Sequence, residues 1–113
     1  MSKDILVVDD DRTNLIMAER LLSDEFHVIP VTSGELALEF LAKAEPDLIL
    51  LDINMPGMDG FEVLHNIKTN RAWEKIPVIF LTAKSEDSDK ILGLTAGADD
   101  YITKPFNPLE VIA

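Results

Sequence analysis

Short apolar runs alternate along the chain with longer stretches in which apolar residues recur at helical spacing. The runs are Ile5–Val8, His27–Val31, Leu48–Leu51, Val78–Leu81 and Tyr101–Ile102. Three of these runs are apolar at consecutive positions, which is typical of strands buried on both faces, as in a parallel sheet covered by helices. Five alternations of strand and helix predict an α/β fold with a doubly wound sheet and right-handed crossovers.

The intervening stretches carry apolar residues three, four and seven positions apart, the pattern of one buried helix face. The sets are Leu15, Ala18 and Leu22; Ala37, Phe40, Leu41 and Ala44; Phe61, Leu64 and Ile67 or Lys68; and Ile91, Leu94 and Ala98. Helix starts are marked by capping-box spacing at Thr32 with Glu35 and at Asp59 with Glu62, and by Ser85 before an acidic first turn.

The sequence predicts a fifth helix close to the end of the chain. Asn107 has the character of an N-cap, Pro108 suits the first helical position, and Glu110 suits the third. The chain ends at Ala113, inside the second turn of this helix. We therefore expect one domain over residues 1–113 whose C-terminal helix is incomplete, as in a fragment of a longer protein.

Composition narrows the class of protein. The 113 residues include 10 basic and 21 acidic side chains, a net charge of −11, which disfavours nucleic acid and anionic lipid as partners of this fragment. No apolar run approaches the roughly 18 residues of a membrane span. Cysteine is absent, which excludes disulfides and thiolate metal sites. We expect a small, acidic, cytoplasmic domain that does not associate with membranes.

The carboxyl ends of the predicted strands are the most polar places in the sequence. The first strand ends in Asp9-Asp10-Asp11, the third in Asp52 and the fourth in Thr82, and the fifth leads to Lys104-Pro105. Ligands of open parallel sheets bind at these ends. Closely spaced carboxylates resist full ionisation unless a cation is bound. Carboxylate oxygens are hard ligands that suit Mg²⁺, which also takes phosphate oxygens as ligands. The sequence therefore predicts a metal-assisted phosphate site.

Four separated motifs, in order, resemble the receiver domain of two-component response regulators. They are Ile5–Asp10, Asp52–Gly60, Leu81–Ala83 and Gly97–Phe106. The resemblance implies a flavodoxin-like sheet of five parallel strands in the order 2-1-3-4-5. It also implies phosphorylation by a sensor histidine kinase or a phosphotransfer protein.

The resemblance assigns a role to each matching position. Asp52 would accept the phosphoryl group, and Lys104 would pair with a phosphate oxygen. Mg²⁺ would be held by Asp10, by Asp52 and by the backbone carbonyl of Asn54, while Asp9 would act through a bound water. Such a domain is a regulatory switch that assists its own phosphotransfer and dephosphorylation, without being a turnover enzyme.

The family also implies the parts of a conformational switch. Thr82 would hydrogen-bond the arriving phosphoryl group, the small Ala83 would leave room for this movement, and Tyr101 would turn inward. A cis bond before Pro105 would aim Lys104, since proline lowers the cost of cis to about 0.5–1 kcal/mol.

The run from Gly93 to Phe106 is similar to receivers joined to winged-helix DNA-binding domains, and receivers fused to diguanylate cyclases share much of it. In the winged-helix branch, receivers dimerise on activation through the fourth helix, the fifth strand and the fifth helix. Lys90 and Glu110 match positions that can pair across such a dimer, and Asp99 or Asp100 would meet basic residues of the partner.

Other interpretations remain open at this point. Asp9-Asp10-Asp11 alone reads as a solvated acidic turn, and Asp11 is expected to face solvent. Asp9-x-Asp11-x-Thr13 also matches the first motif of haloacid-dehalogenase-type phosphatases, with Asp9 as nucleophile and Asp11 as general acid. That interpretation leaves Asp52–Gly60 without a role. A third possibility is a pseudo-receiver that binds partners without phosphorylation.

Overall fold

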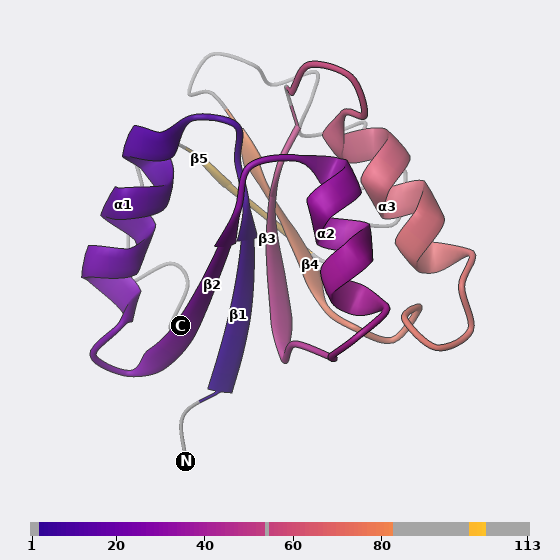
Figure 1. The fold of residues 1–113 in the computed structure, drawn as a ribbon, viewed down its shortest axis with the longest axis horizontal. Coiled ribbons are helices and arrows are strands. Elements are labelled where there is room, and N and C mark those ends of the chain that lie inside the picture. The colour runs from indigo at the N-terminus through magenta and orange to yellow at the C-terminus, as the bar shows by residue number, and fades with distance from the viewer. Residues whose placement is uncertain (1–2, 54, 83–99, 104–113) are drawn as a thin grey trace.

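A computed structural model describes residues 3–53, 55–82 and 100–103. Five parallel strands form one sheet in the order β2-β1-β3-β4-β5, which confirms the predicted strand order (Figure 1). The strands are β1 Lys3–Val8, β2 Phe26–Val31, β3 Leu48–Asp52, β4 Val78–Thr82 and β5 Asp100–Thr103. The predicted fourth and fifth helices lie outside the described residues.

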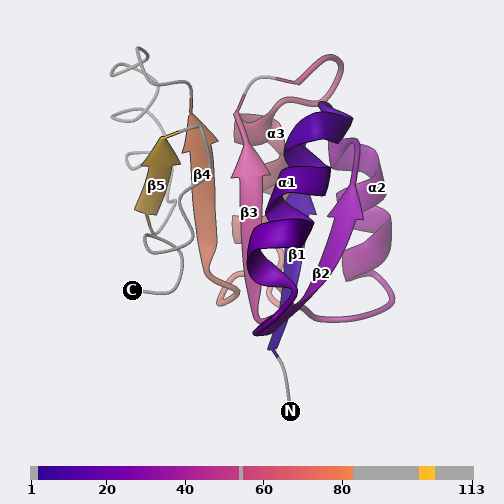
Figure 2. The ribbon, with the colours of Figure 1, turned by 90° about the vertical axis from the view of Figure 1, so that its left-hand side faces the viewer.

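Three helices connect the first four strands and cover both faces of the sheet. They are α1 Arg12–Leu22, α2 Gly34–Leu41 and α3 Gly60–Lys68. Helix α1 lies against one face, while α2 and α3 lie side by side against the other (Figures 1 and 2). This arrangement is the doubly wound architecture that the alternating pattern predicts.

The consecutive apolar residues of β1, β3 and β4 are largely buried on both faces of the sheet, as predicted. In β1, Leu6 and Val8 belong to the core beneath α2 and α3, whereas Ile5 and Val7 belong to the core beneath α1. The helices contribute the residues predicted for their inner faces, notably Leu15, Ala18 and Leu22 from α1, all buried. Strand β1 therefore joins two apolar cores.

Helix α2 begins one residue later than the capping pattern indicates. The N-cap is Ser33, whose hydroxyl accepts a hydrogen bond from the Leu36 N–H at 3.1 Å, and not the predicted Thr32. The helix ends at Leu41, so Ala44 lies beyond it. Asp59, in contrast, caps α3 as predicted and accepts from the Glu62 N–H at 2.9 Å.

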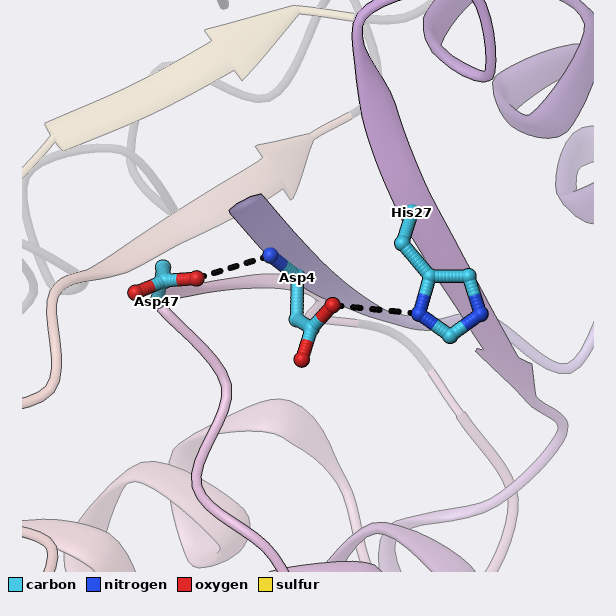
Figure 3. Close-up of polar contacts among 3 residues, drawn as sticks. All are labelled: Asp4, His27 and Asp47. Atoms are coloured by element: carbon cyan, nitrogen blue, oxygen red, sulfur yellow. Dashed lines mark hydrogen bonds and ion pairs between the residues drawn. The ribbon is translucent and has the colours of Figure 1, made fainter. Parts of the chain in front are cut away.

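The amino-terminal ends of β1, β2 and β3 are joined by polar contacts among Asp4, His27 and Asp47. The Asp4 N–H donates to Asp47 Oδ2 at 2.7 Å, and Asp4 Oδ1 lies 3.0 Å from His27 Nδ1 (Figure 3). The Asp47 N–H in turn donates to the Asp4 carbonyl oxygen at 2.8 Å. These contacts lie at the amino-terminal ends of the strands, whereas the predicted site lies at their carboxyl ends.

None of the three described helices is long and apolar enough to cross a membrane.

Candidate metal centre

The pairing of β1 with β3 brings together two acidic segments that are more than forty residues apart in the sequence. Val8, the last residue of β1, pairs with Leu51 of β3. One residue further along each chain, Asp9 leaves β1 and Asp52 ends β3. The same register therefore sets Asp9 beside Asp52 at the carboxyl edge of the sheet.

Asp9, Asp10 and Asp52 form a cluster of carboxylates in which one oxygen from each residue lies within 4.8 Å of the others. Asp9 is fully buried and Asp52 is 5% exposed, while Asp10 is exposed to solvent. The prediction that these carboxylates meet at the strand ends is thus confirmed by the geometry.

The donor set of this cluster fits a hard divalent cation. Three carboxylate oxygens so close together repel each other, and a cation offsets this repulsion most directly. Mg²⁺ takes oxygen ligands and keeps several waters, so it needs only one or two carboxylates from the protein. Asp10 is exposed, so solvent reaches this side of the cluster.

The buried Asp9 carboxylate is held by hydrogen bonds to both of its oxygens. The Asp11 N–H donates to Oδ1 at 3.0 Å, and the Asn14 side-chain amide donates through Nδ2 to Oδ2 at 3.1 Å. The Asp9 N–H donates to the Val31 carbonyl oxygen at 3.1 Å, tying the residue to β2. The sequence prediction missed Asn14, whose only signal is a side-chain donor in the first turn of the helix after the acidic run.

Asp11 does not belong to the cluster, although it adjoins it in the sequence. Its side chain is exposed, as predicted, and caps α1 by accepting a hydrogen bond from the Thr13 N–H at 2.9 Å. Asp11 therefore fixes the start of the helix that carries Asn14. An N-cap role also accounts for its acidic side chain without any part in acid–base chemistry.

The segment that follows Asp52 is a closed loop. The Gly60 N–H donates to the Ile53 carbonyl oxygen at 2.9 Å, so the first residue of α3 returns to the end of β3. An ideal Cβ atom at Gly60 would lie 2.5 Å from the Asp52 carbonyl oxygen, which only glycine avoids. Gly57 within the loop has a φ of 73°, a conformation that glycine adopts at little cost.

Strand β4 places one more of the predicted residues, Thr82, at this edge, and β5 carries two others, Asp100 and Tyr101, further from it. Thr82 ends β4 and pairs with Thr103, the last residue of β5. Tyr101 and Asp100 lie earlier on β5, paired with Phe80 and Ile79. The remaining predicted site and interface residues lie outside the described residues: Asn54, Ala83, Lys90, Asp99, Lys104, Pro105 and Glu110.

The family model for the response regulator receiver domain matches residues 5–113, which include all three clustered aspartates. The chain belongs to the response regulator receiver family. Receivers are regulatory signalling domains of two-component systems, and they bind Mg²⁺ in an acidic pocket. The family match does not favour the phosphatase or the pseudo-receiver interpretation.

This receiver is similar to curated regulatory proteins. It is 46% identical over 114 residues to the regulatory protein VanRc of Enterococcus gallinarum, covering 100% of this chain and 48% of that protein. It is 44% identical over 114 residues to the alkaline phosphatase synthesis transcriptional regulatory protein PhoP of Bacillus subtilis, covering 100% of this chain and 47% of that protein. The chain thus spans about half the length of the curated relatives it matches.

Among solved structures, the receiver resembles the receiver domain of a sensor histidine kinase from Pseudomonas aeruginosa. The TM-score is 0.89 with 30% sequence identity, and the match covers 99% of this chain and 93% of the other. That structure has a magnesium ion coordinated in its active site cleft.

Proposed function

We propose that this receiver accepts a phosphoryl group on Asp52 from a phosphohistidine of a histidine kinase or a phosphotransfer protein. The observation that carries the proposal is the place of Asp52. Its nearly buried carboxylate ends β3 within a cluster that also contains Asp9 and Asp10. Family membership supports the same role.

In this reaction an Asp52 carboxylate oxygen attacks the phosphorus atom in line with the phosphorus–nitrogen bond of the phosphohistidine. The new bond is an acyl phosphate, the phosphorus–nitrogen bond breaks, and the imidazole leaves with the electron pair. A carboxylate is a weak nucleophile, so the site contributes chiefly by positioning and by stabilising charge.

We propose Asp10, Asp52 and the backbone carbonyl of Asn54 as direct ligands of Mg²⁺, with Asp9 acting through a bound water. The cation supplies charge neutralisation for the phosphoryl oxygens. Asp9 and Asp10 orient and hold it, while Lys104 pairs with a phosphate oxygen. The same groups would assist both phosphotransfer and the later hydrolysis of the acyl phosphate.

The phosphoryl group would bias a two-state switch. It adds nearly two negative charges and three acceptor oxygens, which would draw in the Thr82 hydroxyl and the Lys104 ammonium. In this proposal Ala83 would leave room for Thr82, Tyr101 would follow it inward, and a cis bond before Pro105 would aim Lys104. A shift from 1:99 to 99:1 needs about 5.5 kcal/mol of differential interaction, which several charge-assisted hydrogen bonds can supply.

The output would pass through the fourth helix, β5 and the fifth helix. We propose that activated receivers pair through this face, with Lys90 opposite Glu110 and with Asp99 or Asp100 opposite basic side chains. Similarity to VanRc and PhoP over half their length supports residues 1–113 as the receiver of a longer transcriptional regulator. In that protein, DNA binding would belong to a separate domain, and a cytoplasmic location follows from this role.

The test is phosphoryl labelling with an acyl phosphate donor and Mg²⁺. Asp52→Asn should abolish labelling, because an amide is not a nucleophile toward phosphorus. Asp24→Asn is the matched control, since Asp24 is exposed in the turn after α1 and should retain labelling. Labelling that survives in Asp52→Asn but disappears in Asp9→Asn would overturn the proposal in favour of the phosphatase mechanism.

A further inference from the structure

Asn14 lies against the acidic cluster but contributes no carboxylate to it. Its side chain is half-buried, and its Nδ2 atom donates to Asp9 Oδ2 at 3.1 Å. Asp9 is fully buried, so the orientation of its carboxylate is determined by protein groups. The contact therefore connects a neutral residue of α1 to one member of the metal centre.

The hydrogen bonds that the Asp9 carboxylate accepts from Asp11 and Asn14 differ in origin. The bond to Oδ1 comes from the backbone N–H of Asp11 and persists whatever side chain occupies position 11. The bond to Oδ2 comes from the Asn14 side chain. The terminal torsion of an aspartate has a broad energy profile, so each hydrogen bond to the carboxylate narrows the range of this torsion. The bond from Asn14, to the other oxygen, restricts that rotation further.

Helix α1 holds the Asn14 amide at the distance that this bond requires. Asn14 is the third residue of α1, whose start is fixed by the Asp11 cap and by the Leu15 N–H, which donates to the Asp11 carbonyl oxygen at 3.2 Å. Leu15 packs into the core beneath α1. The backbone of Asn14 is therefore anchored on both sides.

An amide is well suited to hold a carboxylate beside a cation site. A lysine or arginine at position 14 would also donate to Asp9, but its positive charge would compete with the cation. The asparagine amide is neutral, so it orients the carboxylate while leaving its negative charge available to the metal. Partners of this kind are known to tune metal affinity through the group they hold.

We propose that Asn14 is a positioning residue of the receiver site, which holds the Asp9 carboxylate in the orientation that supports the divalent cation. The proposal rests on the proposed function, because it takes the Asp9, Asp10 and Asp52 cluster as the metal centre. It concerns the strength of cation binding and does not assign Asn14 any contact with the phosphoryl group.

The test is direct binding of Mn²⁺, followed through the paramagnetic resonance of the free ion, at fixed pH and ionic strength. Asn14→Leu keeps the side-chain size and removes the donor. It should raise the dissociation constant by up to roughly tenfold, because loss of a direct ligand's partner costs about 10–100-fold and Asp9 acts through a bound water. Asn14→Gln restores a donor and should recover part of the affinity.

Asn66→Leu is the matched control. Asn66 is exposed on α3 and donates through its side-chain amide to the Glu62 carbonyl oxygen at 2.9 Å, away from the cluster. This variant should bind Mn²⁺ like the original protein. An Asn14→Leu protein whose dissociation constant equals that of Asn66→Leu would overturn the proposal.

A second readout separates positioning from general stability. Acyl phosphate labelling of Asn14→Leu should need a higher Mg²⁺ concentration for half-maximal rate, with a maximum rate close to that of the original protein. A lower maximum rate at unchanged half-saturating Mg²⁺ would contradict the proposal. If Asn14→Leu does not fold, Asn14→Ser carries the same expectations, because its shorter side chain cannot reach Asp9 Oδ2.

Failure of the proposed function would look different. If the original protein neither binds Mn²⁺ nor is labelled on Asp52, the metal centre itself is refuted, and the role of Asn14 falls with it. If the original protein binds Mn²⁺ and is labelled, while Asn14→Leu has the same dissociation constant, only the positioning role is refuted.

Discussion

Gly60 packs directly on the backbone of Asp52. An ideal Cβ atom at Gly60 would lie 2.5 Å from the Asp52 carbonyl oxygen and 2.7 Å from the Ile53 Cα atom. Both are backbone atoms at the end of β3, so a side chain at position 60 cannot be accommodated by a change of rotamer. The first residue of α3 thereby controls the position of the proposed phosphoryl acceptor.

We expect Gly60→Ala to destabilise the protein and to impair phosphoryl labelling together. The added methyl group forces either α3 or the end of β3 to shift, and overpacking of this kind costs about 1–3 kcal/mol. Urea unfolding measures the loss of stability, and labelling per folded molecule measures the displacement of Asp52. Unchanged values of both would show that the loop relaxes without moving Asp52.

Gly34 also lies in a close contact, but its neighbours there are side-chain atoms and not backbone atoms. Its ideal Cβ atom would lie 2.5 Å from Val63 Cγ2, at the contact between α2 and α3. Gly34→Ala should therefore destabilise the protein by about 1–3 kcal/mol. Val63→Ala removes the methyl group in the way, so the double variant should lose less free energy of unfolding than the sum of the two single variants. Additive losses in urea unfolding would argue against a direct clash.

Asp11→Ala should lower the stability of the protein by removing a helix cap, without abolishing the labelling of Asp52. Loss of the side-chain acceptor for the Thr13 N–H should lower the free energy of unfolding by about 1 kcal/mol, and Asp11→Ser should restore most of it. Labelling of Asp52 should persist in both variants, because the Asp11 backbone N–H still donates to Asp9. A complete loss of labelling in Asp11→Ala would instead support a general acid at this position.

Removal of one carboxylate from the cluster should have opposite effects with and without the cation. Asp10→Asn reduces repulsion in the metal-free protein, so its free energy of unfolding should rise slightly, by less than about 1 kcal/mol for this exposed group. Mg²⁺ at about 100 times its dissociation constant should stabilise the original protein by about 2.7 kcal/mol. The same Mg²⁺ concentration should stabilise Asp10→Asn far less.

Thermal unfolding with and without Mg²⁺ measures both effects of Asp10→Asn, and Asp24→Asn again serves as the control that should respond like the original protein. Equal stabilisation of Asp10→Asn and the original protein by Mg²⁺ would remove Asp10 from the proposed ligand set.

The strands were predictable from the sequence because the apolar runs are short and regularly spaced, whereas the strand order rested on the resemblance to receiver domains. The acidic cluster followed from the same pattern, since Asp9 and Asp52 immediately follow apolar positions of neighbouring strands. Asn14 was not predictable in this way. A polar residue in the first turn of a helix is common, and its contact with Asp9 depends on how α1 leaves β1.

The start of α2 shows a second limit of sequence patterns. Thr32 and Ser33 are both good N-cap residues, and the capping-box spacing to Glu35 favours Thr32. The structure uses Ser33, which makes Gly34 the first residue of the helix, where it packs on Val63. Packing between two helices thus decides between two caps of similar local quality, and local sequence does not contain that contact.

The reciprocal hydrogen bonds between Asp4 and Asp47 have a consequence at the far end of the sheet. Because β1 and β3 are apolar on both faces, a slip of one residue between them would still bury apolar side chains, so their pattern specifies the alignment weakly. The Asp4 and Asp47 N–H groups each bond the other residue, one position before Ile5 and Leu48, the first pair of these strands. These two hydrogen bonds oppose a shift of β1 relative to β3. The alignment of Asp9 with Asp52 therefore depends on a contact five residues away, at the amino-terminal ends of the strands.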